Sequence, residues 1–246
     1  MKKLLYLFII SSILLCACRH TDSTALLRQA DAVVYGNAES ALKLLSLIKN
    51  PERLPFEEKM LYGWLRTFAH NVRGASMAAD SLILPAFHYF VAGPDTVKML
   101  NSFVLKSKYL YWQKKHKEAM AVLDSGIAAA TACRDTYLMV NMLSEKANRY
   151  VYVEKDYKKA IEAHLRAIAI PEDEGLCYSL GIAMGLQGND SASYYMDRSI
   201  ELVEKKKDTT RLVHYLRNYA QLLSYISSDY KKAAEVSKRL RSLAPD

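Results

Sequence analysis

The chain has 246 residues and a formal net charge of +8 at pH 7, with basic and acidic residues interleaved along its length. Its one tight basic cluster, Glu204-Lys205-Lys206-Lys207, is typical of a solvated helical face and argues against a nucleic-acid partner. Two cysteines beyond the N-terminal region, Cys133 and Cys177, are too few for a disulfide scaffold. We expect both to be buried free thiols, although an exported compartment would permit them to pair.

Residues 1–17 have the order of a secretory signal: two lysines, an uncharged apolar run and small residues at a cleavage point. The uncharged run from Leu4 to Cys18 is 15 residues long. A membrane-spanning helix needs roughly 18 or more residues, so a retained membrane anchor is the less favoured alternative.

Leu15-Cys16-Ala17-Cys18 resembles the lipobox of bacterial lipoproteins, in which the cysteine after a small residue is acylated. The resemblance implies that Cys18 becomes the lipidated first residue of the mature chain. Residues 18–23 would then be a short lipidated tether, and several acyl chains would attach the protein stably to a membrane.

From residue 24 onward, the spacing of apolar residues predicts amphipathic helices in antiparallel pairs. Thr24 is expected to cap the first helix. Pro85 should kink a helix that we expect from Ser76 to Phe90. The other expected helices are 24–35, 38–48, 55–72, 94–114 and 116–133, followed by a fourth pair from 136 to 171, a fifth that opens at Leu180-Gly181 and turns at Gly188, and a sixth that is capped by Thr209 or Thr210 and ends at Pro245.

One motif occurs twice: Asp156-Tyr157-Lys158-Lys159-Ala160 recurs 73 residues later as Asp229-Tyr230-Lys231-Lys232-Ala233. This offset is close to two units of a helix-turn-helix repeat, in which a small residue lies where two helices touch. The equivalent alanines are Ala119, Ala160, Ala192 and Ala233, at intervals of 41, 32 and 41 residues. At three turns where such a repeat usually has glycine, the chain has Lys114, Lys155 and Ser228.

The spacing of Ala147, Val151, Tyr157, Ala160 and Ala167 resembles that of the packing residues in tetratricopeptide (TPR) repeats, whose units are about 34 residues long. The resemblance implies an all-α fold: a TPR-like α-solenoid of about six antiparallel helix pairs, forming one repeat domain over residues 24–246. Because each pair buries its apolar face only against its neighbours, the array is the smallest stable unit.

Residue patterns of catalysis are missing from the sequence. No HExxH, paired CxxC, phosphate-binding loop or nucleophile elbow occurs, and the six histidines share no metal-ligand spacing. His88 could transfer a proton, but the helical pattern around it favours a core or interface position. His164 occupies a position where the repeat buries a large side chain, so we expect it to pack. We therefore expect no enzyme activity, no cofactor and no metal.

In the TPR family the first helix of each pair lines a concave groove, and the family's phase implies a partner-binding set on this chain. Polar and aromatic residues at such positions suit recognition of a peptide segment, although an ordinary solvated inner face is an open alternative. Lys108 and Arg149 resemble half of a carboxylate clamp, but Ile182 and Leu222 fill the next equivalent places. The implied groove residues are Asn101, Val104, Lys108, Tyr111, Trp112, Glu145, Arg149, Tyr152, Tyr215, Asn218 and Tyr225.

Ala41-Leu42-Lys43-Leu44-Leu45 and Asp80-Ser81-Leu82-Ile83 are similar to segments of the periplasmic helical half of Gram-negative membrane regulators. Together the resemblances imply a non-catalytic cell-envelope lipoprotein that binds another envelope protein or a peptide segment. It would be lipid-anchored in the outer membrane and face the periplasm, with surface exposure left open. A sensory or regulatory envelope component remains an alternative, as does an assembly factor for outer-membrane proteins that resembles the barrel-assembly lipoprotein.

Overall fold

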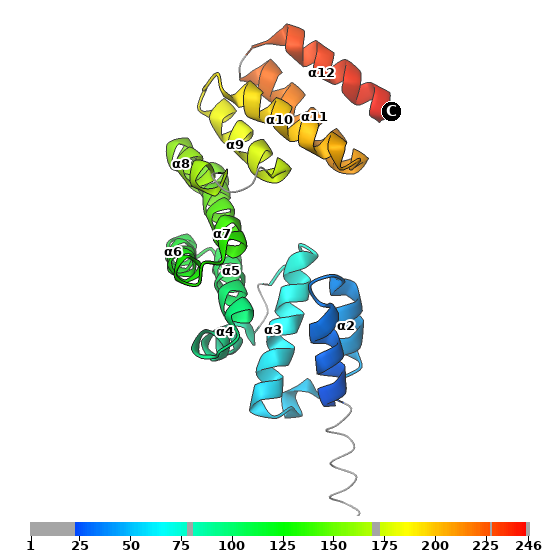
Figure 1. The fold of residues 1–246 in the computed structure, drawn as a ribbon, viewed down its shortest axis with the longest axis vertical. Coiled ribbons are helices and arrows are strands. Elements are labelled where there is room, and N and C mark those ends of the chain that lie inside the picture. The colour runs from blue at the N-terminus through cyan, green and yellow to red at the C-terminus, as the bar shows by residue number, and fades with distance from the viewer. Residues whose placement is uncertain (1–22, 78–80, 169–172, 227, 245–246) are drawn as a thin grey trace, which may run out of the picture. The chain divides into compact units, whose positions relative to one another are not determined.

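A computed structural model describes residues 23–77, 81–168, 173–226 and 228–244, and within these ranges the chain forms helices and connecting segments with no strand. The all-α prediction is therefore confirmed. The chain divides into two compact units, unit 1 (residues 1–125) and unit 2 (residues 126–246), and each is described by itself (Figure 1). The expected signal 1–17 and Cys18 lie outside the described residues. Of the described helices, none is long and apolar enough to cross a membrane.

Unit 1 is centred on α3, which packs against α2, α4 and α5. In its core, Trp64 stacks on Phe68 with ring centroids 5.0 Å apart, and the Trp64 Nε1 donates a hydrogen bond of 2.9 Å to Ser102 Oγ on α5. The unit consists of a helix over 23–33, α2 (Ala38–Ser46), the short 3-10 helix η1 (Pro51–Arg53), α3 (Phe56–Val72), α4 (Ile83–Ala92), α5 (Thr96–Trp112) and the first part of α6 (His116–Ala132).

Two local predictions in unit 1 are wrong. Thr24 lies inside the first helix, where its hydroxyl donates to Glu58 Oε1 on α3 at 2.6 Å instead of capping the helix. The helix expected from Ser76 begins only at Ile83, so Pro85 lies in its first turn. Proline is tolerated there because the first backbone N–H groups of a helix have no intrahelical partner.

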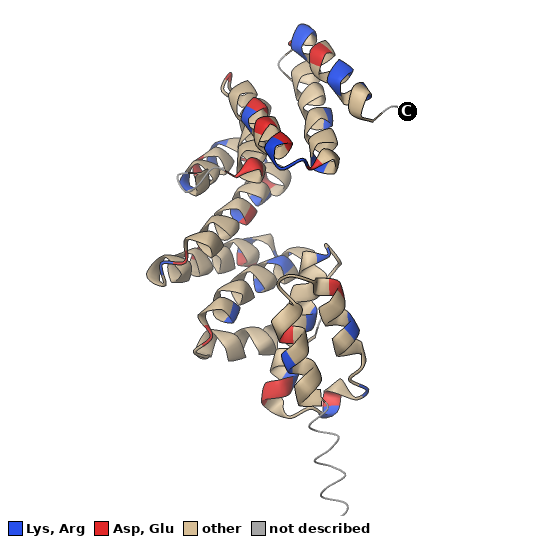
Figure 2. Ribbon diagram, turned by 45° about the vertical axis from the view of Figure 1, so that its right-hand side comes forward, with Lys and Arg blue, Asp and Glu red and all other residues tan. Residues whose placement is uncertain are grey.

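Unit 2 is a succession of helices in which, from α7 to α12, each packs against the next (Figure 1). In addition, α9 contacts α11. Both α10 and α12 carry acidic and basic residues (Figure 2), and on α12 the single acid is Glu235. The elements are the second part of α6, α7 (Thr136–Arg149), the π-helical turn η2 (Tyr150–Glu154), α8 (Tyr157–Ile168), α9 (Glu174–Leu186), α10 (Ala192–Lys205), α11 (Thr209–Tyr225) and α12 (Tyr230–Leu243).

Aspartate side chains begin several of these helices by accepting hydrogen bonds from first-turn N–H groups. Asp135 caps α7, as expected, and Asp229 caps α12. Asp173 caps α9, which therefore starts well before the Leu180 predicted from the repeat phase. Asp208, and not a threonine, caps α11.

Close helix packing and tight turns in the structure agree with the repeated motif. All four equivalent alanines, at 119, 160, 192 and 233, are buried. Lys114, Lys155 and Ser228 adopt φ values of 59°, 58° and 53°, the left-handed conformation that favours glycine. Lysine or serine therefore stands where glycine was expected at these three turns, and the backbone there still adopts the left-handed conformation.

Two side chains of unit 2 depart from simple apolar burial. His164 on α8 is fully buried, as predicted, but neither of its ring nitrogens has a hydrogen-bond partner. Burial lowers the pKa of this histidine to about 4. Cys177 is buried on α9, whereas Cys133 follows α6 and is exposed, and the two are not joined in a disulfide. The prediction of burial is therefore wrong for Cys133.

Candidate functional site

An aromatic cluster lies where α9 packs against α11. The rings of Tyr178 on α9 and Tyr215 on α11 stack in parallel, with centroids 4.1 Å apart and an interplanar angle of 8°. His214 is tilted against both rings, at centroid distances of 5.7 and 6.0 Å. Asn218, one helical turn further on, donates its amide Nδ2 to the His214 carbonyl oxygen at 2.9 Å. We refer to Tyr178, His214, Tyr215 and Asn218 as the α9–α11 cluster.

The residues of the α9–α11 cluster differ in their exposure to solvent, and their polar groups can form hydrogen bonds. Tyr215 is 6% exposed, Tyr178 and Asn218 are half-buried, and His214 is exposed. The His214 Nε2 lies 3.5 Å from the Tyr178 hydroxyl. Burial raises the pKa of Tyr215 to about 12. Burial also raises the pKa of Tyr178, with a further contribution from the nearby Tyr152. At neutral pH these hydroxyls are therefore protonated and can donate hydrogen bonds.

Two glycines of α9, Gly181 and Gly185, allow α10 and α11 to pack closely against it. A Cβ atom at Gly185 would lie 2.3 Å from Leu222 Cδ1 on α11, and one at Gly181 would lie 2.8 Å from Met196 Cγ on α10. Neither distance is sterically possible unless the side chain of Leu222 or Met196, or the helix that carries it, moves. The two glycines, one helical turn apart, therefore let α9 approach both α10 and α11.

The buried carboxylate of Glu174 links the start of α9 to α11 through an ion pair. Glu174 is 3% exposed, and its carboxylate forms ion pairs with Arg211 on α11 and with Lys206 after α10. Burial by itself would raise the pKa of Glu174, but the hydrogen bond from Lys206 and the charges of Lys206 and Arg211 hold it below its usual value. Arg211 precedes Tyr215 by one turn, so the ion pair helps to orient the face of α11 that carries the cluster.

The π-helical turn η2 brings a further tyrosine to this region. The backbone N–H of Asp156 donates to the Tyr150 carbonyl at 3.0 Å, and the turn ends at Lys155 in the left-handed conformation. Tyr152, in the middle of the turn, is 58% exposed. Single π turns are rare and occur frequently at functional sites, which makes Tyr152 a natural extension of the α9–α11 cluster.

The expected groove residues of unit 2 differ in accessibility. Tyr215, Asn218 and Tyr225 lie along α11, and Tyr225 is 85% exposed near its end. Arg149 is only 7% exposed, and its guanidinium lies 3.9 Å from the Glu145 carboxylate on the same helix. The arginine half of the expected carboxylate clamp is therefore buried and already paired with an acid.

The remaining expected residues lie on α5 in unit 1. Val104 is buried there, and Asn101 turns its amide back to the Val97 carbonyl, which accepts a hydrogen bond of 2.9 Å. Lys108 and Tyr111 are half-buried, and Trp112 is 47% exposed. Tyr111 packs edge-on against Trp112, with centroids 6.4 Å apart. Tyr111 and Trp112 thus form an aromatic surface on unit 1.

Two members of the cluster, Tyr178 and His214, were missed by sequence reasoning. Tyr178 precedes Ile182 by one helical turn, so it shares the face that the repeat phase had already assigned to Ile182. His214 precedes Asn218 by the same spacing. The helical period could therefore have predicted which face of its helix each residue occupies. It could not have predicted that Tyr178 on α9 and His214 on α11 lie against each other.

Within the described part of the chain, no group of three or more histidine, cysteine, aspartate or glutamate side chains could hold a metal ion. No protein-family model matches the chain, and no curated protein matches it. The fold and the site thus define its class only as an all-helical protein with an aromatic cluster between packed helices. What this cluster offers chemically is ring contact and hydrogen bonding, and function has to be argued from those groups.

Proposed function

We propose that this protein is a non-catalytic cell-envelope lipoprotein that binds an extended segment of another envelope protein through the α9–α11 cluster and Tyr152. One observation carries this proposal: partly exposed aromatic and polar side chains converge on a face whose geometry is held by ring stacking and by the Glu174 ion pairs. Groups fixed before binding lose little conformational freedom when a ligand arrives.

The side chains of this face match the needs of an extended peptide. Tyrosine rings provide large contact areas with few rotatable bonds. Their hydroxyls, together with the imidazole of His214 and the amide of Asn218, can form hydrogen bonds with the carbonyl and N–H groups that an extended backbone exposes. Apolar side chains of the segment would lie on the exposed ring of Tyr152.

A TPR-like solenoid is the architecture that we propose for the helical array. It is supported by the packing of each helix on its successor in unit 2, by the contact of α9 with both α10 and α11, and by the buried alanines near the starts of α8, α10 and α12. In such an array the first helices of successive pairs share one face. Here they are α7 with η2, α9 and α11, the elements that carry Tyr152, Tyr178 and Tyr215.

Site-specific photo-crosslinking in intact cells tests the binding face. A benzophenone amino acid replaces Tyr152 in one strain and Tyr137, which is 78% exposed in the first turn of α7, in a matched control. We expect a discrete adduct from position 152 that position 137 does not give, and that is lost when His214→Ser is added. The same adducts from both positions would refute the binding face.

The lipid anchor has its own test, because it is supported by the lipobox resemblance alone. Cys18→Ser should abolish incorporation of labelled palmitate and release the chain from the membrane fraction, whereas Cys16→Ser should change neither. If the Cys18→Ser protein still carried label and sedimented with membranes, acylation of Cys18 would be wrong, and the binding face of unit 2 would stand independently of it.

A further inference from the structure

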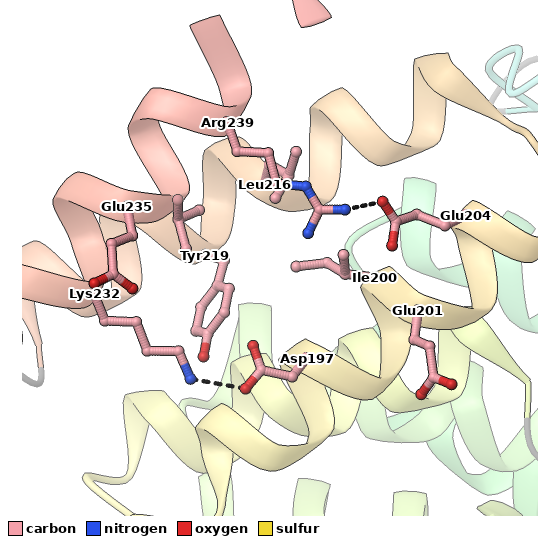
Figure 3. A pocket seen from close by; sticks show the side chains of 10 residues that line it. Asp197, Ile200, Glu201, Glu204, Leu216, Tyr219, Lys232, Glu235 and Arg239 are labelled. Atoms are coloured by element: carbon pink, nitrogen blue, oxygen red, sulfur yellow. Dashed lines mark hydrogen bonds and ion pairs between the residues drawn. The ribbon is translucent and has the colours of Figure 1, made fainter. Parts of the chain in front are cut away.

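A pocket of about 350 Å³ lies between α10 and α12, with α11 as its floor (Figure 3). Ligand pockets in proteins measure about 300–1,000 Å³, so this one has room for a single side chain or another small group. Its floor residues Leu216 and Tyr219 belong to a different side of α11 from His214 and Asn218. At 100° per residue the two sets are centred about 150° apart around the helix, so the pocket and the α9–α11 cluster are distinct sites.

The inner surface of the pocket is apolar. Ile200 of α10 is 5% exposed and Leu216 of α11 is 1% exposed. Val236 of α12 is half-buried and also lines the pocket. A guest with an aliphatic portion would therefore bury its own apolar surface and the exposed part of Val236, which is favourable in proportion to the area covered.

Ion pairs between α10 and α12 cross the pocket at two places. The Lys232 Nζ lies 2.7 Å from Asp197 Oδ2, and the Arg239 guanidinium pairs with Glu204 (Figure 3). The Lys232 ammonium also lies 5.4 Å from the centroid of the Tyr219 ring. Asp197 and Glu204 are separated by two helical turns, about 10 Å along α10. The cationic side chains of α12 thus already use this surface by extending an aliphatic stem across it to reach a carboxylate.

One carboxylate that lines the pocket has no ion-pair partner among the described residues. Glu235 lies between Lys232 and Arg239 on α12, is exposed, and makes no hydrogen bond or ion pair with any described residue. Glu201 is paired only along its own helix, with Arg198 at 2.7 Å and Lys205 at 3.0 Å. Of the residues that line the pocket, four are carboxylates and two are cations, and Glu235 is the carboxylate that lacks a partner.

We propose that this pocket binds a lysine or arginine side chain of a partner protein. The charged end of the guest pairs with Glu235, and its aliphatic stem covers Ile200 and Val236, in the manner that Lys232 and Arg239 show on the same surface. An anionic guest would be repelled by the unpaired carboxylate of Glu235. An uncharged guest would take Glu235 out of water without pairing it, which is unfavourable.

Methyl NMR of the full chain in detergent, labelled at isoleucine and valine methyl groups, tests this assignment. The probes are N-acetyl-arginine amide and N-acetyl-lysine amide, with N-acetyl-citrulline amide as the uncharged counterpart of the arginine probe. We expect the cationic probes to shift the Ile200 and Val236 resonances in a saturable way, and added salt to weaken this binding. Glu235→Gln should reduce the affinity by about two- to fivefold, the weight of one exposed ion pair.

Glu162→Gln is the matched control, because Glu162 is an exposed glutamate on α8 that also makes no hydrogen bond or ion pair with a described residue. It should leave the affinity unchanged. Equal binding of the citrulline probe, equal affinity of the Glu235→Gln and parent proteins, or an absence of shifts at Ile200 and Val236 would each overturn the assignment. None of these results would bear on the crosslinks expected at Tyr152, since the pocket and the α9–α11 cluster are probed by different ligands.

Discussion

Replacing His164 by leucine should stabilise the protein, and should do so more strongly in mild acid than at neutral pH. The imidazole of His164 is fully buried on α8 and neither nitrogen has a hydrogen-bond partner. Leaving a buried polar group unsatisfied costs about 1–3 kcal/mol. Leucine removes both unsatisfied nitrogens while keeping a large apolar side chain at the position, so a gain of that order is expected at neutral pH.

The acid dependence follows from the lowered pKa. Burial shifts the pKa of His164 from 6.5 to about 4 in the folded protein. The unfolded chain therefore binds a proton more readily than the folded one, and folding stability falls as pH decreases through the interval between these two values. From about pH 7.5 to about pH 5 this single group should cost about 2 kcal/mol, out of a full effect of about 3 kcal/mol below both pKa values.

Urea unfolding followed by far-ultraviolet circular dichroism would measure the difference between parent and His164→Leu at both pH values. Groups that titrate equally in both proteins contribute equally to the two free energies of unfolding, so their contributions cancel when one free energy is subtracted from the other. His88→Leu, at an exposed position on α4, controls for the loss of a histidine as such. If the difference between parent and His164→Leu were the same at both pH values, His164 would not be buried in its neutral form, and the reasoning would fail.

Other substitutions test the turns, the helix contacts and the buried ion pair. Lys155→Gly should raise the free energy of unfolding by about 0.5–1 kcal/mol, because glycine adopts φ near 58° without strain. An unchanged or lower free energy of unfolding in urea would contradict the left-handed conformation of residue 155. Gly185→Ala should destabilise the protein by about 1–3 kcal/mol, because the added methyl group would overlap with Leu222. Gly36→Ala is the control: no atom lies within 4 Å of a Cβ at that position, so this substitution should not lower the melting temperature in the same way. Glu174→Gln should cost about 1–3 kcal/mol near neutral pH. Since the folded pKa of Glu174 is lowered, this difference should shrink as pH falls through that pKa, and a difference that stays constant in acid would count against the ion pairs.

Prediction from the sequence succeeded where the signal is local. The repeat phase anticipated the burial of His164, and Asp135 caps the helix that it was expected to cap. Prediction failed where a neighbouring helix decides the outcome. Arg149 was expected to face a partner but is buried beside Glu145, because the exposure of a helical residue depends on what packs against its helix. Pro85 was expected to kink a helix that starts later than its pattern suggested.

By itself, the sequence determined the helical class, several of the capping aspartates and the buried alanines of the repeated motif, because capping and periodic burial depend on residues within a few positions of one another. Tertiary structure alone decided which distant groups meet. Tyr178 reaches His214 across 36 positions, Glu174 reaches Arg211 across 37, and Lys232 reaches Asp197 across 35. These contacts depend on how closely and at what rotation the helices pack, which is set by side-chain shape at their interfaces and by the glycines of α9.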